Sequence, residues 1–156
     1  MVILGIDPGT RYSGYAILAP SGNSFAIVDI GCLQQSSAKP LPERILKFHD
    51  FFDQLITQWH ITDLGLETPF LGKNAQNFLK LGYLRGILYM LAQKNKINIL
   101  EFSPREVKCS VTGFGGASKE QVAVMVKKLF PQFAQPVRTD ISDALAVALC
   151  ALWNRR

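Results

Sequence analysis

The order of apolar segments constrains the fold more than any other feature of this sequence. Three β-prone segments come first, at residues 2–6, 12–18 and 24–33. The first is an apolar run that ends at the turn sequence Asp7-Pro8-Gly9, and Pro20-Ser21-Gly22-Asn23 separates the other two. We therefore expect the chain to open with an antiparallel meander of three strands.

Strands and helices alternate through the rest of the chain. Apolar residues recur at three- and four-residue intervals in residues 41–59, which predicts an amphipathic helix. A strand at 62–66, a helix at 74–94, a strand at 97–102, a helical turn from Ser103-Pro104 and helices at 118–130 and 140–154 follow. Because parallel strands need crossover helices, this order predicts an α/β fold with a five-stranded mixed sheet flanked by helices, as in RNase H-like proteins.

Length and composition predict one globular domain spanning residues 1–156, because 48% of the residues are hydrophobic and 19% are charged. The apolar start is interrupted at Asp7 and lacks a basic region, so we expect no signal peptide and a cytoplasmic protein. The most apolar stretch, at residues 144–153, is about half the length needed to span a bilayer, so we expect no membrane role. Three widely spaced cysteines predict free thiols, and no Cys or His spacing suits zinc. We interpret His49 and His60 as structural or surface residues.

The basic charge lies in the second half of the chain. Residues 1–66 carry four Lys and Arg against six Asp and Glu, whereas residues 67–156 carry thirteen against six. With a net charge of +5, this asymmetry favours a polyanionic partner. Ordinary solubilising charge explains the same numbers, so charge alone does not decide.

Four acidic residues stand at the ends of predicted elements. Asp7 closes the first strand, Glu67 closes the fourth, and Asp140 and Asp143 begin the last helix. Sites in such sheets gather at the carboxyl ends of strands, and i, i+3 spacing places two aspartates on one helix face. Each acid also has a structural explanation, as a turn former, a polar strand end or a helix cap with its acidic partner. Only the joint pattern of the four acids favours a catalytic role over these structural explanations.

Four converging carboxylates predict a site for hard divalent cations. Mg²⁺ prefers oxygen ligands, and phosphodiester hydrolysis benefits from two ions roughly 3.5 to 4 Å apart. One ion helps to generate the attacking hydroxide, and the other stabilises the departing 3′ oxygen. We expect two Mg²⁺ ions, with Mn²⁺ as a substitute. Because the carboxylates repel each other without metal, neutralising one of them is not expected to harm stability.

Three motifs resemble those of the RuvC family of Holliday junction resolvases, the crossover junction endodeoxyribonucleases. They are Gly5-Ile6-Asp7-Pro8-Gly9-Thr10 with Gly14-Tyr15, Lys73-Asn74-Ala75 with Leu79-Lys80-Leu81-Gly82 and Arg85-Gly86, and Asp140-x-x-Asp143-Ala144-Leu145-Ala146. The resemblance runs from Gly5 nearly to the C-terminus. It implies an RNase H-like fold in which the four acids bind metal and catalyse, with Asp7 touching both ions.

The resemblance also implies partners and products. It implies a homodimer that nicks two strands of a four-way junction symmetrically and leaves ligatable 5′-phosphate and 3′-hydroxyl ends. Association with the RuvA and RuvB branch-migration proteins is implied in the same way.

Four further residues are implied to contact DNA, namely Phe70, Lys73, Lys108 and Lys119. Lys108 and Lys119 align with family lysines near the scissile strand, where they would clamp phosphate or stabilise transition-state charge. Phe70 falls where the family carries an aromatic ring that faces the junction centre and can stack on unpaired bases. Solvated lysines and a core phenylalanine are the competing interpretations. Thr68-Pro69 departs from the family pattern, which leaves the stiffness and base preference of this loop open.

The predicted helix at 74–94 is the candidate dimer interface. Gly82 and Gly86 lie four residues apart and allow close helix approach. The same helix carries an apolar stripe made of Phe78, Leu81, Leu84, Leu88 and Leu91. Close packing of this stripe on the protein's own sheet is the alternative.

Three other functions remain open from the sequence. An actin-like or sugar-kinase ATPase also opens with Gly-Ile-Asp-x-Gly-Thr, although such enzymes need two domains and 156 residues supply one. A related nuclease could process structured RNA. A catalytically silent DNA-binding module is the third alternative, although all four acids are present.

Overall fold

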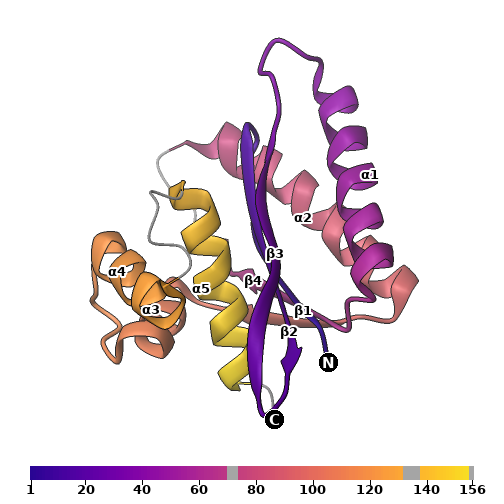
Figure 1. The fold of residues 1–156 in the computed structure, drawn as a ribbon. Coiled ribbons are helices and arrows are strands. Elements are labelled where there is room, and N and C mark those ends of the chain that lie inside the picture. The colour runs from indigo at the N-terminus through magenta and orange to yellow at the C-terminus, as the bar shows by residue number, and fades with distance from the viewer. Residues whose placement is uncertain (70–73, 132–137, 155–156) are drawn as a thin grey trace.

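The computed structural model describes residues 1–69, 74–131 and 138–154. It consists of a five-stranded sheet between two layers of helices (Figure 1). The strands are β1 (Ile3–Asp7), β2 (Tyr12–Ser21), β3 (Ser24–Gln34), β4 (Asp63–Glu67) and β5 (Asn98–Phe102). The helices are α1 (Leu41–Trp59), α2 (Ala75–Asn95), α3 (Pro104–Thr112), α4 (Lys119–Leu129) and α5 (Thr139–Asn154).

The sheet has the strand order β3-β2-β1-β4-β5. The first three strands pair antiparallel, whereas β4 pairs parallel with both β1 and β5. This arrangement confirms the expected meander and the mixed sheet. It also places the carboxyl ends of β1 and β4 side by side, since Ile6 is the register partner of Leu66.

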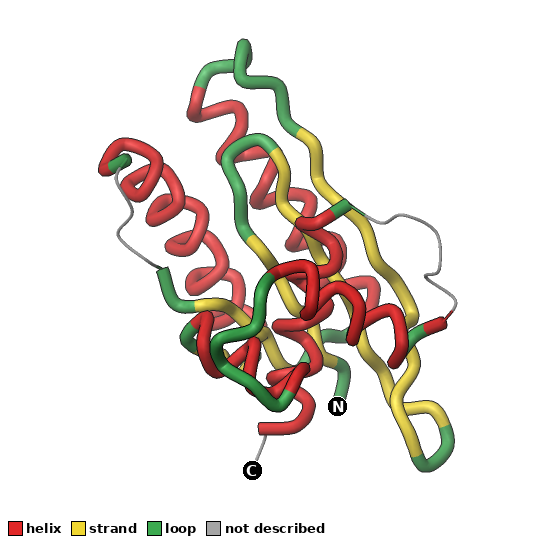
Figure 2. Tube along the Cα trace, turned by 90° about the vertical axis from the view of Figure 1, so that its left-hand side faces the viewer, coloured by secondary structure: helices red, strands yellow, loops and turns green. Residues whose placement is uncertain are grey.

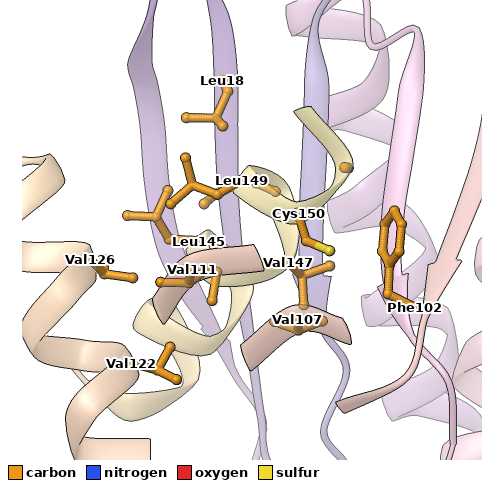
Figure 3. Packing of buried hydrophobic residues seen from close by; sticks show 14 of the residues in the cluster. Leu18, Phe102, Val107, Val111, Val122, Val126, Leu145, Val147, Leu149 and Cys150 are labelled. Atoms are coloured by element: carbon orange, nitrogen blue, oxygen red, sulfur yellow. The ribbon is translucent and has the colours of Figure 1, made fainter. Parts of the chain in front are cut away.

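Helices cover both faces of the sheet (Figure 1). On one face, α1 and α2 bury an apolar cluster that includes Leu4, Ile6, Phe48, Phe52, Leu64 and Leu88. On the other face, α5 lies against β1 and β2, and α3 and α4 pack outside it. Figure 3 shows this second core, in which Leu145, Val147 and Leu149 of α5 meet valines from α3 and α4.

Glycines let α5 approach the sheet closely. A Cβ atom added to Gly5 would lie 2.4 Å from the main-chain oxygen of Ala144, and one added to Gly14 would lie 1.9 Å from that of Asp140. No real side chain tolerates such contacts, so these positions need glycine. The close approach brings the first turn of α5 to the carboxyl end of β1.

Two elements are several residues longer than the sequence predicts. β2 continues through Pro20 to Ser21, and the two-residue turn Gly22–Asn23 closes the hairpin, with Gly22 at a φ of 58°. In Figure 2 this hairpin extends past the other strands at the lower right. The expected helical turn after Ser103 is the nine-residue helix α3, which a reciprocal pair of Ser103 and Glu106 hydrogen bonds caps.

The apolar stripe of α2 faces the protein's own core. Leu84, Leu88 and Leu91 are buried in the core that α1 and α2 form with the sheet, as the alternative interpretation holds, whereas Phe78 and Leu81 of the same stripe are only partly buried. The opposite face exposes Leu79, Tyr83 and Met90, and added Cβ atoms at Gly82 and Gly86 would meet nothing within 4 Å. The three buried leucines and the glycine pair therefore lie on different faces of α2, and the glycine face is exposed.

The cysteines agree with the expectation of free thiols, because Cys32, Cys109 and Cys150 are all unpaired. Among the described residues, no helix combines the length and hydrophobicity that crossing a bilayer requires.

Candidate active site

A cavity of about 160 Å³ opens where the carboxyl ends of β1 and β4 meet the helices of the α5 face. Asp7 ends β1 and Glu67 ends β4, so their positions follow from the parallel pairing of these adjacent strands. The polar lining consists of Asp7, Glu67, Asp143, Lys108 and Lys119, and the apolar lining of Pro104, Val107, Val122, Ala146 and Val147. Three of the four predicted acids and two of the four predicted DNA contacts therefore share one cavity.

Capped helix starts bring the two lysines to the cavity. The Ser103 cap starts α3 directly after β5, which places Lys108 in the second turn of that helix. Ser118 and Gln121 form the same reciprocal cap on α4, so that Lys119 is its first residue. The Lys119 ammonium donates a hydrogen bond to Oδ2 of Asp143 at 2.9 Å.

Negative charge is crowded at the centre of the cavity. Burial raises the pKa of the Asp7 carboxyl from 3.8 to about 7, and the negative charges of Asp143, Glu67 and Asp140 add to this rise, while Lys119 opposes it. Burial also raises the pKa of Glu67, again with a contribution from Asp143. The hydrogen bond to Asp143 raises the pKa of Lys119. The site therefore favours the binding of positive charge.

Asp140 stands apart from the other three acids and does not line the cavity. Its Oδ2 accepts hydrogen bonds from Nη2 and Nε of Arg138 at 3.0 and 3.3 Å. The Arg138 guanidinium in turn stacks on the Tyr12 ring, with 3.9 Å between its Cζ and the ring centroid. Asp140 is nevertheless near enough for its charge to raise the pKa of Asp7. Asp140 is therefore close to the cavity but outside its lining.

The donor set fits a hard divalent cation. Asp7, Glu67 and Asp143 supply carboxylate oxygens, and neither histidine nor cysteine lines the cavity. Across the described parts of the chain, no three acidic, histidine or cysteine side chains converge into a ready-made metal cluster. The ammonium of Lys119, which pairs with Asp143, provides the local counter-charge in this arrangement. Asp7, Glu67 and Asp143 are the residues of this cavity that could hold such a cation.

Phe70 and Lys73, the other two predicted DNA contacts, lie outside the described residues. The chain just before them is well anchored, because the Thr68 amide donates to the Phe102 carbonyl at 2.7 Å. This bond fixes the end of β4 to β5.

Two arginines beside the site carry roles that the sequence did not predict. Arg138 pairs with Asp140, and Arg85 of α2 donates from Nη1 to the main-chain carbonyl of Glu67 at 2.6 Å. A signal existed for Arg85, since it is a charged residue flanked by the buried Leu84 and Leu88 of an apolar stripe. For Arg138 we find no sequence signal for its contact.

Comparison with known proteins identifies the family. The sequence pattern of the family described as Crossover junction endodeoxyribonuclease RuvC matches residues 3–151 of this chain. The chain belongs to the RuvC family. The match confirms the resemblance drawn from the three motifs, and it spans every described strand and all but the last residues of α5.

Individual RuvC proteins are similar over nearly the whole chain. Crossover junction endodeoxyribonuclease RuvC of Chloroherpeton thalassium is 44% identical over 150 residues, which are 96% of this chain and 81% of that protein. The solved Thermus thermophilus RuvC structure has a TM-score of 0.88 at 26% identity and covers 98% of this chain and 94% of its own. T. thermophilus RuvC in complex with Holliday junction substrate has a TM-score of 0.87 at 23% identity, with the same coverage. These likenesses confirm the RNase H-like fold.

Proposed function

We propose that this RuvC-family chain is an endodeoxyribonuclease that resolves four-way DNA junctions by paired symmetric nicks, with two divalent cations per subunit. One observation carries the proposal: Asp7, Glu67 and Asp143, from three separate elements, line one cavity together with Lys108 and Lys119. The names of the RuvC relatives support the reaction, and the T. thermophilus RuvC complex with a Holliday junction supports the substrate.

The positions of the four acids indicate a different role in metal binding for each. Asp7 is central, because its carboxylate interacts electrostatically with each of the other three acids, and we propose that it contacts both cations. Glu67 and Asp143 flank it, and Asp140 completes the set when its carboxylate turns from Arg138 toward the cavity. Bound Mg²⁺ or Mn²⁺ would supply an activated water and charge stabilisation for the departing oxygen.

The lysines act on the substrate phosphate. Lys108 and Lys119 face the same cavity as the acids, so a phosphate bound there lies within reach of their ammonium groups. The Lys119 side chain is 72% exposed and can leave Asp143 when cations arrive. Its positive charge is then available to stabilise the transition state. We propose Phe70 and Lys73, which follow Glu67 closely in sequence, as further DNA contacts.

We propose a homodimer formed through the open face of α2. Leu79, Tyr83 and Met90 are exposed there, and Gly82 and Gly86 leave room for a second helix. A twofold dimer presents two equivalent sites to two equivalent strands of a symmetric junction. Cytoplasmic location and association with RuvA and RuvB accompany this proposal as expectations from the family.

The test is cleavage of end-labelled DNA by the purified protein. With Mg²⁺, we expect paired nicks at symmetric positions of a four-way junction and none in a linear duplex of the same sequence. Chelator abolishes the nicks. The Asp7→Asn variant is the matched control, and it should bind the junction with unchanged affinity without cutting it, because phosphate attraction comes mainly from basic side chains.

Three results would count against the proposal. A junction that is bound but uncut across Mg²⁺ and Mn²⁺ concentrations would make the chain a binding module. Preferential cleavage of structured RNA would point to RNA processing. Retained cutting by Asp7→Asn would remove Asp7 from the mechanism.

A further inference from the structure

A buried arginine links α2 to the carboxyl end of β4. Arg85 is only 5% exposed, although its neighbours along this face of α2 are leucines. Its Nη1 donates to the main-chain carbonyl of Glu67 at 2.6 Å, and its Nη2 donates to the Tyr89 hydroxyl at 3.0 Å and to Oε1 of Glu101. The Arg85 guanidinium therefore links α2 to β5 and to Glu67, whose side chain is a predicted metal ligand.

The guanidinium is held in a fixed orientation. Glu101 on β5 balances its charge, and the Tyr89 hydroxyl donates to the same Glu101 oxygen at 2.7 Å. Arg85, Tyr89 and Glu101 thus form a closed triangle of hydrogen bonds. Because a guanidinium is planar and donates in fixed directions, pinning one edge also fixes the direction of Nη1 toward Glu67.

The Glu67 carbonyl that Arg85 binds lies at the point where β4 is no longer paired with β1. The parallel pairing of β4 with β1 ends at Ile6 and Leu66, one residue before Glu67. On the other side, the Thr68 amide still bonds to Phe102 of β5. The peptide group between Glu67 and Thr68 is therefore held at its oxygen by Arg85 and at its nitrogen by β5. A peptide group held at both ends fixes the direction in which the Glu67 side chain leaves the backbone.

We propose that Arg85 is a positioning residue that aims the Glu67 carboxylate into the cation site through the Glu67 main-chain carbonyl. Arg85 does not line the cavity itself. The inference rests on the proposed function in one respect, namely that Glu67 binds metal. Mutation of a partner that orients a metal ligand typically costs about 10- to 100-fold in metal affinity.

The experiment measures the anchor and the metal site separately. Hydrogen exchange of the Thr68 amide reports on the end of β4, and calorimetric titration of Mn²⁺ into the DNA-free protein reports on the cation site. We expect Arg85→Gln to speed Thr68 exchange and to weaken Mn²⁺ binding by about tenfold or more. Arg85→Lys should recover part of both losses, because one ammonium cannot satisfy Glu67 and Glu101 with the geometry of a fork.

Two further variants separate positioning from general stability. Leu88→Ala removes a buried side chain from the same helix without touching the anchor, so it should lower the unfolding midpoint and leave Mn²⁺ affinity unchanged. Glu101→Gln keeps the anchor but loosens its orientation, so it should give a smaller loss of affinity than Arg85→Gln. If Arg85→Gln fails to fold, Arg85→Lys and Glu101→Gln carry the test.

The results for Arg85→Gln, Leu88→Ala and the wild type distinguish failure of the inference from failure of the proposed function. Wild-type Mn²⁺ affinity in a folded Arg85→Gln protein would overturn the inference whether or not Thr68 exchange changes, as would an equal loss of affinity in Leu88→Ala. A wild-type protein that binds no Mn²⁺ would instead contradict the proposed function. In that case Thr68 exchange would still decide whether Arg85 anchors the strand end.

Discussion

Replacing Asp7 with asparagine should stabilise the metal-free protein while abolishing cleavage. Burial and three neighbouring acids raise the pKa of Asp7 from 3.8 to about 7 in the folded state. Below pH 4 the carboxyl is protonated in both the folded and the unfolded state and has no effect on stability. Between about pH 4 and 7 the folded state retains a proton that the unfolded state has lost. The free energy of unfolding therefore falls as the pH rises through this window.

The size of the effect follows from the rise in pKa. A change from 3.8 to about 7 is about three pKa units, and each unit corresponds to about 1.4 kcal/mol. Above pH 7 the ionised Asp7 thus costs up to about 4 kcal/mol of stability. Asparagine removes the charge but still buries an amide, which costs on the order of 1 kcal/mol or more. We expect Asp7→Asn to gain on the order of 2 to 3 kcal/mol at pH 8.

Urea unfolding with chelator at pH 5 and at pH 8 measures this gain. The advantage of Asp7→Asn over the wild type should be larger at pH 8 than at pH 5 and level off above pH 7.5. Addition of Mg²⁺ should reduce or reverse it, because the cation stabilises only a folded protein that can bind it. Equal stability of the two proteins at pH 8 in chelator, with no pH dependence of the difference, would refute the reasoning.

Four further predictions address packing, chemistry, assembly and metal competition. Gly5→Ala drives a Cβ against Ala144, so thermal unfolding should show a loss of about 2 kcal/mol or more and cleavage should fall. Lys119→Met should cost at most about 1 kcal/mol of stability but slow single-turnover cleavage about a hundredfold. Met90→Glu should yield monomers in analytical ultracentrifugation. Arg138→Gln should tighten Mn²⁺ binding in calorimetry by up to about fivefold, because a competing cation is removed.

The sequence predicts the fold and the centre of the site because both follow from local patterns. Asp7 and Glu67 each end an apolar strand, and the pairing of those strands places them together. Gly5 and Gly14 belong to the motif that allows α5 to bring its aspartates to the sheet. The positions of these residues depend on hydrophobic periodicity and strand order, which can be recognised in the sequence.

Contacts between distant side chains could not be predicted in the same way. The apolar stripe of α2 shows that a face is buried, but not whether the cover is the protein's own sheet or a second subunit. Asp140 has the i, i+3 spacing that places it beside Asp143, yet its carboxylate pairs with Arg138, whose reach toward Tyr12 no local pattern encodes. The bond from Arg85 to Glu67 is likewise a tertiary contact between α2 and β4.

Anomalous diffraction from crystals grown with Mn²⁺ tests the central claim most directly. We predict two Mn²⁺ peaks about 3.5 to 4 Å apart in the cavity, with Asp7 contacting both ions and Glu67, Asp140 and Asp143 completing their coordination. The absence of Mn²⁺ from this cavity at a saturating concentration, or its binding only at other sites, would contradict the account.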